Sequence, residues 1–212
     1  IVEVLNRVIM NAKRASAPAQ INIPRDMWTQ VIDIDLPAMV EFERPSGGDK
    51  AILEAAAMLS SSTNPVILNG AGVVLSEGAI EASKALAERL DAAVCVGYQH
   101  NDAFPGSHPL FSGPLGYNGS KAAMELIKEA DVVLCLGTRL NPFSTLPGYG
   151  IDYWPQNAKI IQVDINPDRI GLTKKVSVGI VGDAAKVADK ILNELSDNAG
   201  DLNRTERKQK IA

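Results

Sequence analysis

The sequence predicts an α/β fold, a doubly wound parallel sheet with helices on both faces. Two observations predict it. Short runs that are almost entirely apolar recur along the chain, such as residues 65–69 and 131–136, and such runs are typical of strands buried on both faces of a parallel sheet. Longer stretches with apolar residues at helical spacing lie between them, and this alternation indicates βαβ units.

The alternation is regular after residue 49. Strands are predicted at residues 65–69, 92–96, 131–136 and 159–165, with a short edge strand at 176–181. Helices are predicted at 49–59, 77–90, 120–130 and 183–195, the first and last capped by Asp49 and Asp183, because a carboxylate accepts hydrogen bonds from first-turn amides. We expect a sheet of about five or six strands in which the first four strands are central.

The first part of the chain has a different pattern. Residues 1–14 form an amphipathic helix, and residues 20–23 form a short strand between Pro18 and Pro24, since proline is tolerated at strand ends. The chain begins with Ile1 in what already reads as a helix, so we expect a piece of a longer protein. The predicted organisation is the end of a preceding domain (1–36), a linker (37–49), a central domain (50–197) and a polar linker tail (198–212).

Composition excludes several classes of protein. The net charge is −4, with 21 basic and 25 acidic residues, so no nucleic-acid partner is expected. The apolar runs are too short to span a membrane, and no export leader opens the chain. Cys95 and Cys135 lie inside apolar runs, and buried reduced thiols suit a cytoplasmic location.

Two glycines follow the first predicted strand. Gly70 and Gly72 precede a helix, where glycines let a backbone turn approach a phosphate at a helix N-terminus. The third glycine of the dinucleotide fingerprint is replaced by Leu75. The motif is therefore partial, and both a phosphate-binding turn and a tight turn without a ligand remain open.

A candidate nucleotide site combines that turn with two others. Gly137 and Arg139 follow the strand at 131–136, and Asp164 ends the strand at 159–165. The carboxyl ends of parallel strands meet at one edge, where ligands bind in such folds. We expect Gly70, Gly72, Gly137, Arg139 and Asp164 to lie together at this edge. Asp164 would then bind a ribose, and Arg139 would bind a phosphate or a carboxylate. Alternatively, Arg139 holds Asp164 or a loop carbonyl, and Asp164 holds either Arg139 or a turn amide.

No catalytic or metal site is predicted. The long irregular segment 97–117 is of a length that is commonly functional, and it contains His100, Asp102, His108 and Ser112. No nucleophile-elbow glycines surround Ser112, and no zinc spacing or phosphate loop occurs. The residues alone therefore give the chain no chemistry of its own.

The motifs taken together resemble the thiamine diphosphate-dependent enzymes. Residues 69–72, 113–119, 136–139 and 162–167 occur in the order found in the middle domain of that family, and residues 65–192 resemble that domain. Residues 17–26 resemble the terminal strand of its pyrimidine-binding domain, so 1–36 would be the C-terminal end of that domain. Residues 100–110 and 141–154 are most similar to the acetyltransferases that act on sulfoacetaldehyde.

The resemblance implies an activity for a longer protein. Such an enzyme uses thiamine diphosphate and Mg²⁺ to convert sulfoacetaldehyde and phosphate to acetyl phosphate and sulfite, in the degradation of sulfonates such as taurine, and it works as a homo-oligomer, a dimer or tetramer. The family's activating glutamate and its Gly-Asp-Gly metal motif do not occur in this chain. We therefore expect this fragment to be inactive alone. The alternatives are an acetolactate synthase-like carboligase, a nucleotide-binding module and a structural module.

The resemblance also concerns a nucleotide in the middle domain. Acetolactate synthase holds FAD there and oxalyl-CoA decarboxylase holds ADP. Relatives that hold FAD resemble Gly-Ala-Arg-Phe-Asp-Asp where this chain has residues 137–142, Gly-Thr-Arg-Leu-Asn-Pro. The missing acidic pair argues against FAD, and we favour an edge filled by the protein's own side chains.

Overall fold

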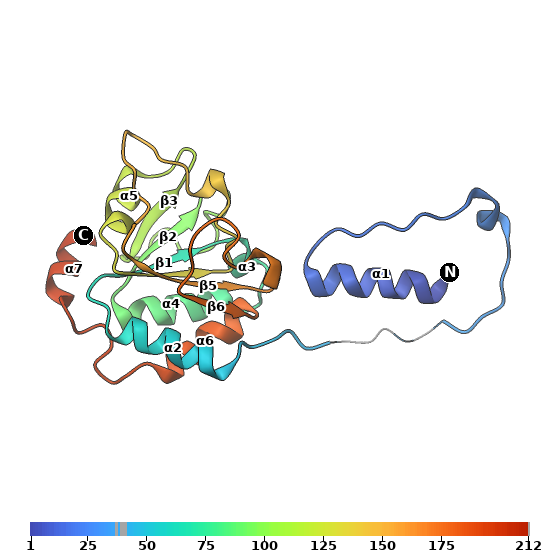
Figure 1. Ribbon diagram of the computed structural model, residues 1–212, viewed down its shortest axis with the longest axis horizontal. Coiled ribbons are helices and arrows are strands. Elements are labelled where there is room, and N and C mark those ends of the chain that lie inside the picture. Colours follow the sequence, from blue (N-terminus) through green and yellow to red (C-terminus); the bar gives the residue numbers. More distant parts are fainter. Residues whose placement is uncertain (37, 39–41, 212) are drawn as a thin grey trace. The chain divides into compact units, whose positions relative to one another are not determined.

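A computed structural model describes residues 1–36, 38 and 42–211 (Figure 1). The chain divides into two compact units, Ile1–Arg44 and Pro45–Ala212. The predicted division at 1–36, 37–49, 50–197 and 198–212 stays a prediction. Positions 37 and 39–41 of the predicted linker lie outside the described residues.

The second unit contains a six-stranded sheet in which every neighbouring pair is parallel, in the order β3-β2-β1-β4-β5-β6. This confirms the doubly wound α/β prediction and the four central strands. The bounds are β1 Pro65–Asn69, β2 Ala93–Gly97, β3 Phe111–Leu115, β4 Val132–Leu136, β5 Lys159–Asp164 and β6 Val178–Val181. All five residues of β1, β2 and β4 are buried, as expected for strands covered on both faces.

Helices cover the two faces unequally. The α-helices of this unit are α2 Asp49–Ser60, α3 Ala71–Val74, α4 Ala79–Leu90, α5 Lys121–Lys128, α6 Ala184–Glu194 and α7 Arg204–Ile211. Helices α2, α4 and α6 lie together on one face of the sheet and α5 lies on the other (Figure 1). The buried side chains form two clusters, one on each face.

Local capping interactions explain where the helices begin, and one of the predicted caps is wrong. Asp183 caps α6 as predicted, because its carboxylate accepts from the amides of Ala185 and Lys186. Ser120 caps α5 in the same way. The prediction of Asp49 as a cap is wrong, because Gly48 is the N-cap of α2 and Asp49 is the first helical residue. There its negative charge still favours the helix N-terminus.

One strand and two α-helices of this unit were not predicted. Strand β3 lies inside segment 97–117, which was expected to be irregular. Helix α3 is a single turn after β1. Helix α7 lies within the polar tail, and its Arg207 is only 3% exposed.

The first unit is small and has little core. It contains α1, Val2–Ala15, and a 3₁₀ turn, η1, Arg25–Thr29. Helix α1 agrees with the helix predicted at 1–14. The strand predicted at 20–23 is wrong, because a strand forms only by pairing, and no described residue forms a ladder with this segment.

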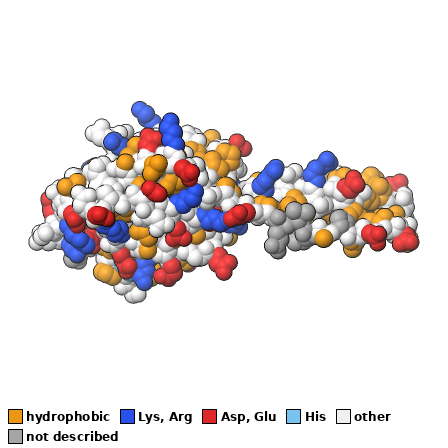
Figure 2. Space-filling view, turned by 90° about the horizontal axis from the view of Figure 1, so that it is seen from below, with side chains coloured by type: hydrophobic (Ala, Val, Ile, Leu, Met, Phe, Trp, Pro, Cys, Tyr) orange, Lys and Arg blue, Asp and Glu red, His pale blue; other side chains and the backbone are white. Residues whose placement is uncertain are grey.

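Charges of both signs are mixed on the surface. Figure 2 shows lysine and arginine side chains interspersed with aspartate and glutamate on the face it presents. This agrees with the small net charge of −4. No described helix has the length and apolar character needed to cross a bilayer.

Candidate functional site

The strand order places the candidate site between β1 and β4. The chain leaves β1 toward β2 and leaves β4 toward β5, in opposite directions along the sheet. In doubly wound sheets, ligands bind outside the carboxyl ends of the strands at such a reversal. The turns that flank it are residues 70–72, after β1, and residues 137–140, after β4.

The structure brings the three predicted glycines into direct contact. The amide of Gly72 donates to the carbonyl of Gly137 at 2.8 Å. A Cβ on Gly72 would lie 2.6 Å from the Cα of Gly137, and a Cβ on Gly70 would lie 2.5 Å from the Cβ of Thr138. Gly137 also has a φ of +61°, which side chains rarely adopt. The glycines are therefore needed for two backbone turns to touch.

That contact decides how well the turn fits a phosphate. The Gly72 amide belongs to the turn that a dinucleotide phosphate would approach, but it already donates to Gly137. A phosphate would have to displace this hydrogen bond. The residues at this turn therefore do not fit a nucleotide diphosphate in the arrangement that the structure has.

Asp164 faces its own turn. Its side chain is buried and accepts from the amide of Asn166 at 2.9 Å, and Arg169 lies 3.9 Å from the same carboxylate oxygen. Burial raises the pKa of Asp164, although the Asn166 hydrogen bond and the charges of Arg169 and Arg139 oppose this. Asp164 thus holds a turn amide, one of the arrangements considered from the sequence. Arg139 itself is exposed.

Gln162 is a site residue that the sequence analysis missed. Its side chain is 1% exposed and lies in the middle of β5. The amide group donates to the carbonyls of Thr138 and Arg169, at 3.1 and 3.2 Å, and its oxygen accepts from the amide of Gly171 at 2.8 Å. Gln162 therefore ties together the turns that follow β4 and β5. A lone polar residue in an apolar strand was the signal for this role.

Asn69 has a similar role at the end of β1. Its buried side chain exchanges hydrogen bonds with Ser83 of α4 and donates to the carbonyl of Ala103. Ala103 lies in the connection from β2 to β3. Asn69 therefore fixes the start of this long segment against α4 instead of facing a ligand.

His108 does not pair with Ser112. The Nδ1 atom of His108 accepts from the amide of Leu110, and its Nε2 atom lies 3.1 Å from a carboxylate oxygen of Glu88. Both ring nitrogens are therefore engaged away from Ser112. The hydroxyl of Ser112 is buried without a hydrogen-bond partner among the described residues.

A metal site in the described part of the chain would require a cluster of ligating side chains. A hard cation needs several oxygen ligands. No group of three or more His, Cys, Asp or Glu side chains in the described part of the chain could hold a metal ion.

Comparisons with known proteins agree with the fold. The model of the thiamine pyrophosphate enzyme central domain matches residues 52–191. Sulfoacetaldehyde acetyltransferase of Roseovarius nubinhibens is 75% identical over 210 residues, 99% of this chain and 35% of that protein. A probable acetolactate synthase large subunit of Methanocaldococcus jannaschii is 37% identical over 185 residues, 84% of this chain and 31% of that protein.

A solved structure gives the same result. Benzoylformate decarboxylase from Polynucleobacter necessarius superposes with a TM-score of 0.67 at 25% identity, over 85% of this chain and 33% of that one. The chain spans about a third of the length of the curated relatives named above. The family match begins in α2 and ends in α6, so it contains the whole sheet. The chain belongs to the thiamine pyrophosphate enzyme family and carries its central domain.

Proposed function

We propose that this chain is the central part of a thiamine diphosphate-dependent acetyltransferase that converts sulfoacetaldehyde and phosphate to acetyl phosphate and sulfite. In this reaction the carbon–sulfur bond breaks, sulfite leaves, and the acetyl unit passes to a phosphate oxygen. The observation that carries the proposal is the 75% identity to a sulfoacetaldehyde acetyltransferase along 99% of the chain. The carboligase alternative has weaker support, because the identity to a probable acetolactate synthase is only 37%.

In this proposal the chain supplies scaffold and no catalytic group. Two features of the described residues support that role: the turns after β1 and β4 close on each other, and Asp164 faces a turn amide. Thiamine diphosphate and Mg²⁺ would be held by parts of the longer protein outside this chain.

We further propose that the carboxyl edge of the sheet holds no ADP or FAD. The predicted contacts of Gly70, Gly72, Gly137, Arg139 and Asp164 with a nucleotide stay a prediction, and the hydrogen bond from Gly72 to Gly137 argues against them. Calorimetry with ADP, FAD and CoA on the wild type and on Asp164→Ala tests this. We expect no difference in binding between the two proteins. If the wild type binds one of these ligands and Asp164→Ala lowers the affinity roughly tenfold, the nucleotide site is supported instead.

The proposal also covers the cellular location, the oligomeric state and the metabolic role of the enzyme. The two buried free cysteines support a cytoplasmic location, since such thiols suit a reducing compartment. The family resemblance supports a homo-oligomer, a dimer or tetramer, in the degradation of sulfonates such as taurine. Light scattering on the longer protein would measure the oligomeric state.

The activity is tested with the longer protein in which this chain occurs. The purified enzyme, with thiamine diphosphate and Mg²⁺, is given sulfoacetaldehyde and phosphate, and acetyl phosphate and sulfite are measured. Pyruvate replaces sulfoacetaldehyde in a parallel assay for acetolactate. We expect acetyl phosphate and sulfite in equal amounts, and no product from the 212-residue chain alone. Acetolactate without sulfite release would favour the carboligase.

A further inference from the structure

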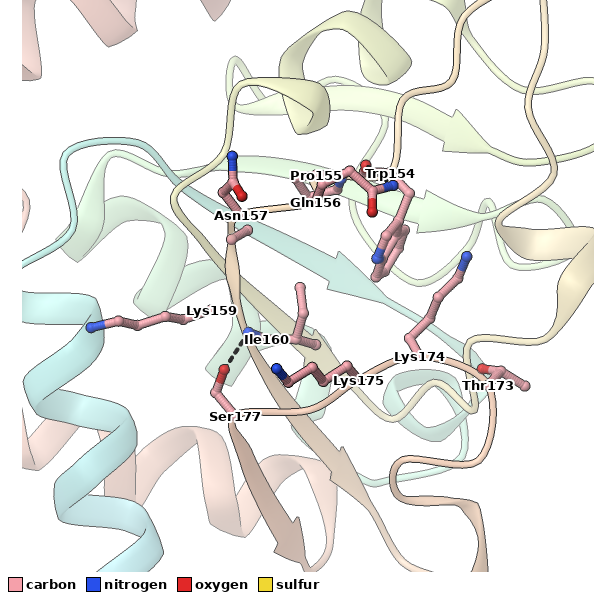
Figure 3. A pocket seen from close by; sticks show the side chains of 11 residues that line it. Trp154, Pro155, Gln156, Asn157, Lys159, Ile160, Thr173, Lys174, Lys175 and Ser177 are labelled. Carbon is pink, nitrogen blue, oxygen red and sulfur yellow. Dashed lines mark hydrogen bonds between the residues drawn. The ribbon is translucent and has the colours of Figure 1, made fainter.

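A hollow lies beside the first residues of β5, away from the carboxyl edge. Its volume is about 510 Å³, within the range of small-molecule sites. Its lining comes from residues 154–160 and from residues 173–175 and 177, which face each other across the hollow (Figure 3). One lining residue, Thr173, contacts the turn after β4, because its hydroxyl donates to the carbonyl of Leu140 at 2.7 Å.

The hollow exists because two connections have no α-helix. The connections from β4 to β5 (residues 137–158) and from β5 to β6 (residues 165–177) are described in full. Their helical segments are the 3₁₀ turns Pro142–Ser144 and Pro167–Arg169. Doubly wound sheets usually place helices on both faces. Without them, the end of the face that α5 covers is partly open, and Ile160 of its core cluster lines the opening.

The lining is positively charged. It includes Lys159, Lys174 and Lys175 but no aspartate or glutamate. None of these lysines forms an ion pair with a described residue, whereas Lys190 and Lys210 pair with carboxylates at 3.1 and 2.8 Å. Three unpaired ammonium groups in a protein with a net charge of −4 indicate a local preference for anions.

The arrangement of the side chains limits which ligands the hollow can bind. Figure 3 shows Lys174 rising toward Trp154, Lys175 extending toward Ile160, and Lys159 pointing away from the other lining residues. The ammonium of Lys174 lies 4.9 Å from the centre of the Trp154 ring. Two cations therefore face the hollow beside a flat apolar surface.

A hydroxyl donor completes the lining. The oxygen of Ser177 accepts from the amide of Ile160 at 3.3 Å, so its own proton can be donated to a ligand. Two ammonium groups and a hydroxyl match the oxygens of a multiply charged anion better than those of a singly charged one.

We propose that this hollow binds a diphosphate group, either free pyrophosphate or the diphosphate of a nucleotide, through Lys174, Lys175 and Ser177. Trp154 flanks the site and would contact the base of a nucleotide. The proposal does not depend on the acetyltransferase activity.

The test uses Trp154 as a reporter. The chain has two tryptophans, so the variant Trp28→Phe leaves Trp154 as the only one. Pyrophosphate is titrated at constant ionic strength, with sodium chloride as the balancing salt. We expect a saturating change in emission. ADP should bind at least as tightly as pyrophosphate if the base contacts Trp154, and more weakly if free pyrophosphate is the ligand; adenosine should not bind.

Calorimetry on lysine variants locates the binding. We expect Lys174→Gln and Lys175→Gln each to weaken pyrophosphate binding roughly tenfold. Lys190→Gln, which removes a paired lysine on α6, should leave the affinity unchanged. Circular dichroism checks that the variants fold. The proposal is overturned if neither anion gives a saturating change, or if binding persists unaltered in both Lys174→Gln and Lys175→Gln.

Discussion

Gly137 and Gly150 both have positive φ, +61° and +73°, but their surroundings differ. A Cβ on Gly137 would lie 2.6 Å from the Cα of Gly72, whereas no described atom would lie within 4 Å of a Cβ on Gly150. Left-handed backbone costs a non-glycine residue about 1–2 kcal/mol, and overpacking adds about 1–3 kcal/mol. We expect Gly137→Ala to lower the free energy of unfolding by about 2–5 kcal/mol and Gly150→Ala by about 1–2 kcal/mol.

Urea unfolding of the two variants measures this difference. Equal losses would mean that the turns after β1 and β4 can separate at no cost. The Gly72 amide could then donate to a phosphate instead of to Gly137.

Asp131 joins the start of β4 to the turn before β1. Its carboxylate accepts from the hydroxyl of Ser62, from the amide and hydroxyl of Thr63, and from the amide of Asn64. Burial alone would raise the pKa of Asp131, but these hydrogen bonds outweigh it and hold the pKa below its ordinary value. Because the folded-state pKa is lowered, the stabilisation is complete above the unfolded-state value and is lost as the pH falls through the folded-state value.

We expect Asp131→Asn to lower the free energy of unfolding by about 2–3 kcal/mol at neutral pH, because a neutral amide cannot accept all of these hydrogen bonds. The difference from the wild type should shrink as the pH falls below about 4. Urea unfolding over this pH range is the measurement, with the exposed Asp152→Asn as control. A difference that stays constant with pH would show that the charge of Asp131 is not responsible.

The sequence identified the residues of the carboxyl edge better than their roles. The positions of Gly70, Gly72 and Gly137 after strands were predictable, because glycine permits sharp turns. Whether such a turn faces a ligand or another turn depends on the packing of two strands far apart in sequence. The sequence alone therefore left both readings of Asp164 open, and the role of Gln162 was missed.

Single elements were predictable when their apolar pattern was strong. Strands β1, β2, β4 and β5 were predicted from nearly unbroken apolar runs. Strand β3 was not, because it contains Gly113 and Pro114, which are unusual inside strands. Its place at the edge of the sheet explains them, since proline is tolerated there.

Helix α7 shows a different limit. Its sequence is highly polar, and the polar pattern predicts a tail. The guanidinium of Arg207 donates to the carbonyls of Leu90, Asp91 and Thr63 in the body of the domain and to those of Gly200 and Leu202. Arg207 is thus a buried polar anchor for a mostly polar helix, which Ile211 also holds by packing against both core clusters. A pattern of apolar residues could not have revealed the role of Arg207.

We expect Arg207→Met to release α7 while keeping most of the apolar stem volume of the side chain. Several buried carbonyls lose their donor, each at about 1–3 kcal/mol if they stay dry, and detachment of the helix lets water reach them. Hydrogen exchange should show lost protection over residues 200–211 and little change in the central strands. Gln209→Met, on an exposed side chain of the same helix, is the control. Unchanged protection in Arg207→Met would mean that other contacts dock the helix.

At the scale of the whole molecule, the core belongs to one unit. Every buried hydrophobic side chain identified lies at or beyond Ile52. Among the described residues of the first unit, Ile1–Arg44, no side chain is buried. The stability of a domain comes mainly from the apolar surface that it buries, so the second unit should carry nearly all of it.

The start of that unit is defined by contacts just before α2. The carbonyl of Pro45 accepts from the amide of Asp183 at 2.7 Å, and Ser46 forms a bridge with Gly182. A Cβ on Gly47 would lie 2.8 Å from the side chain of Ile180. Residues 45–47 are therefore fixed to the end of β6, within what the sequence predicted as linker. A truncated chain should therefore begin at residue 45, so that these contacts are kept.

We therefore expect residues 45–212 to unfold in the same cooperative transition as the whole chain, with a free energy of unfolding within about 0.5 kcal/mol. A chain that starts at residue 50 should lose about 1–3 kcal/mol, because it removes the hydrogen bond from Asp183 and the packing of Gly47. Urea unfolding followed by circular dichroism compares the three proteins. A large loss for 45–212 would mean that the first unit stabilises the domain, and equal stability for the two truncations would move the domain boundary back to residue 50.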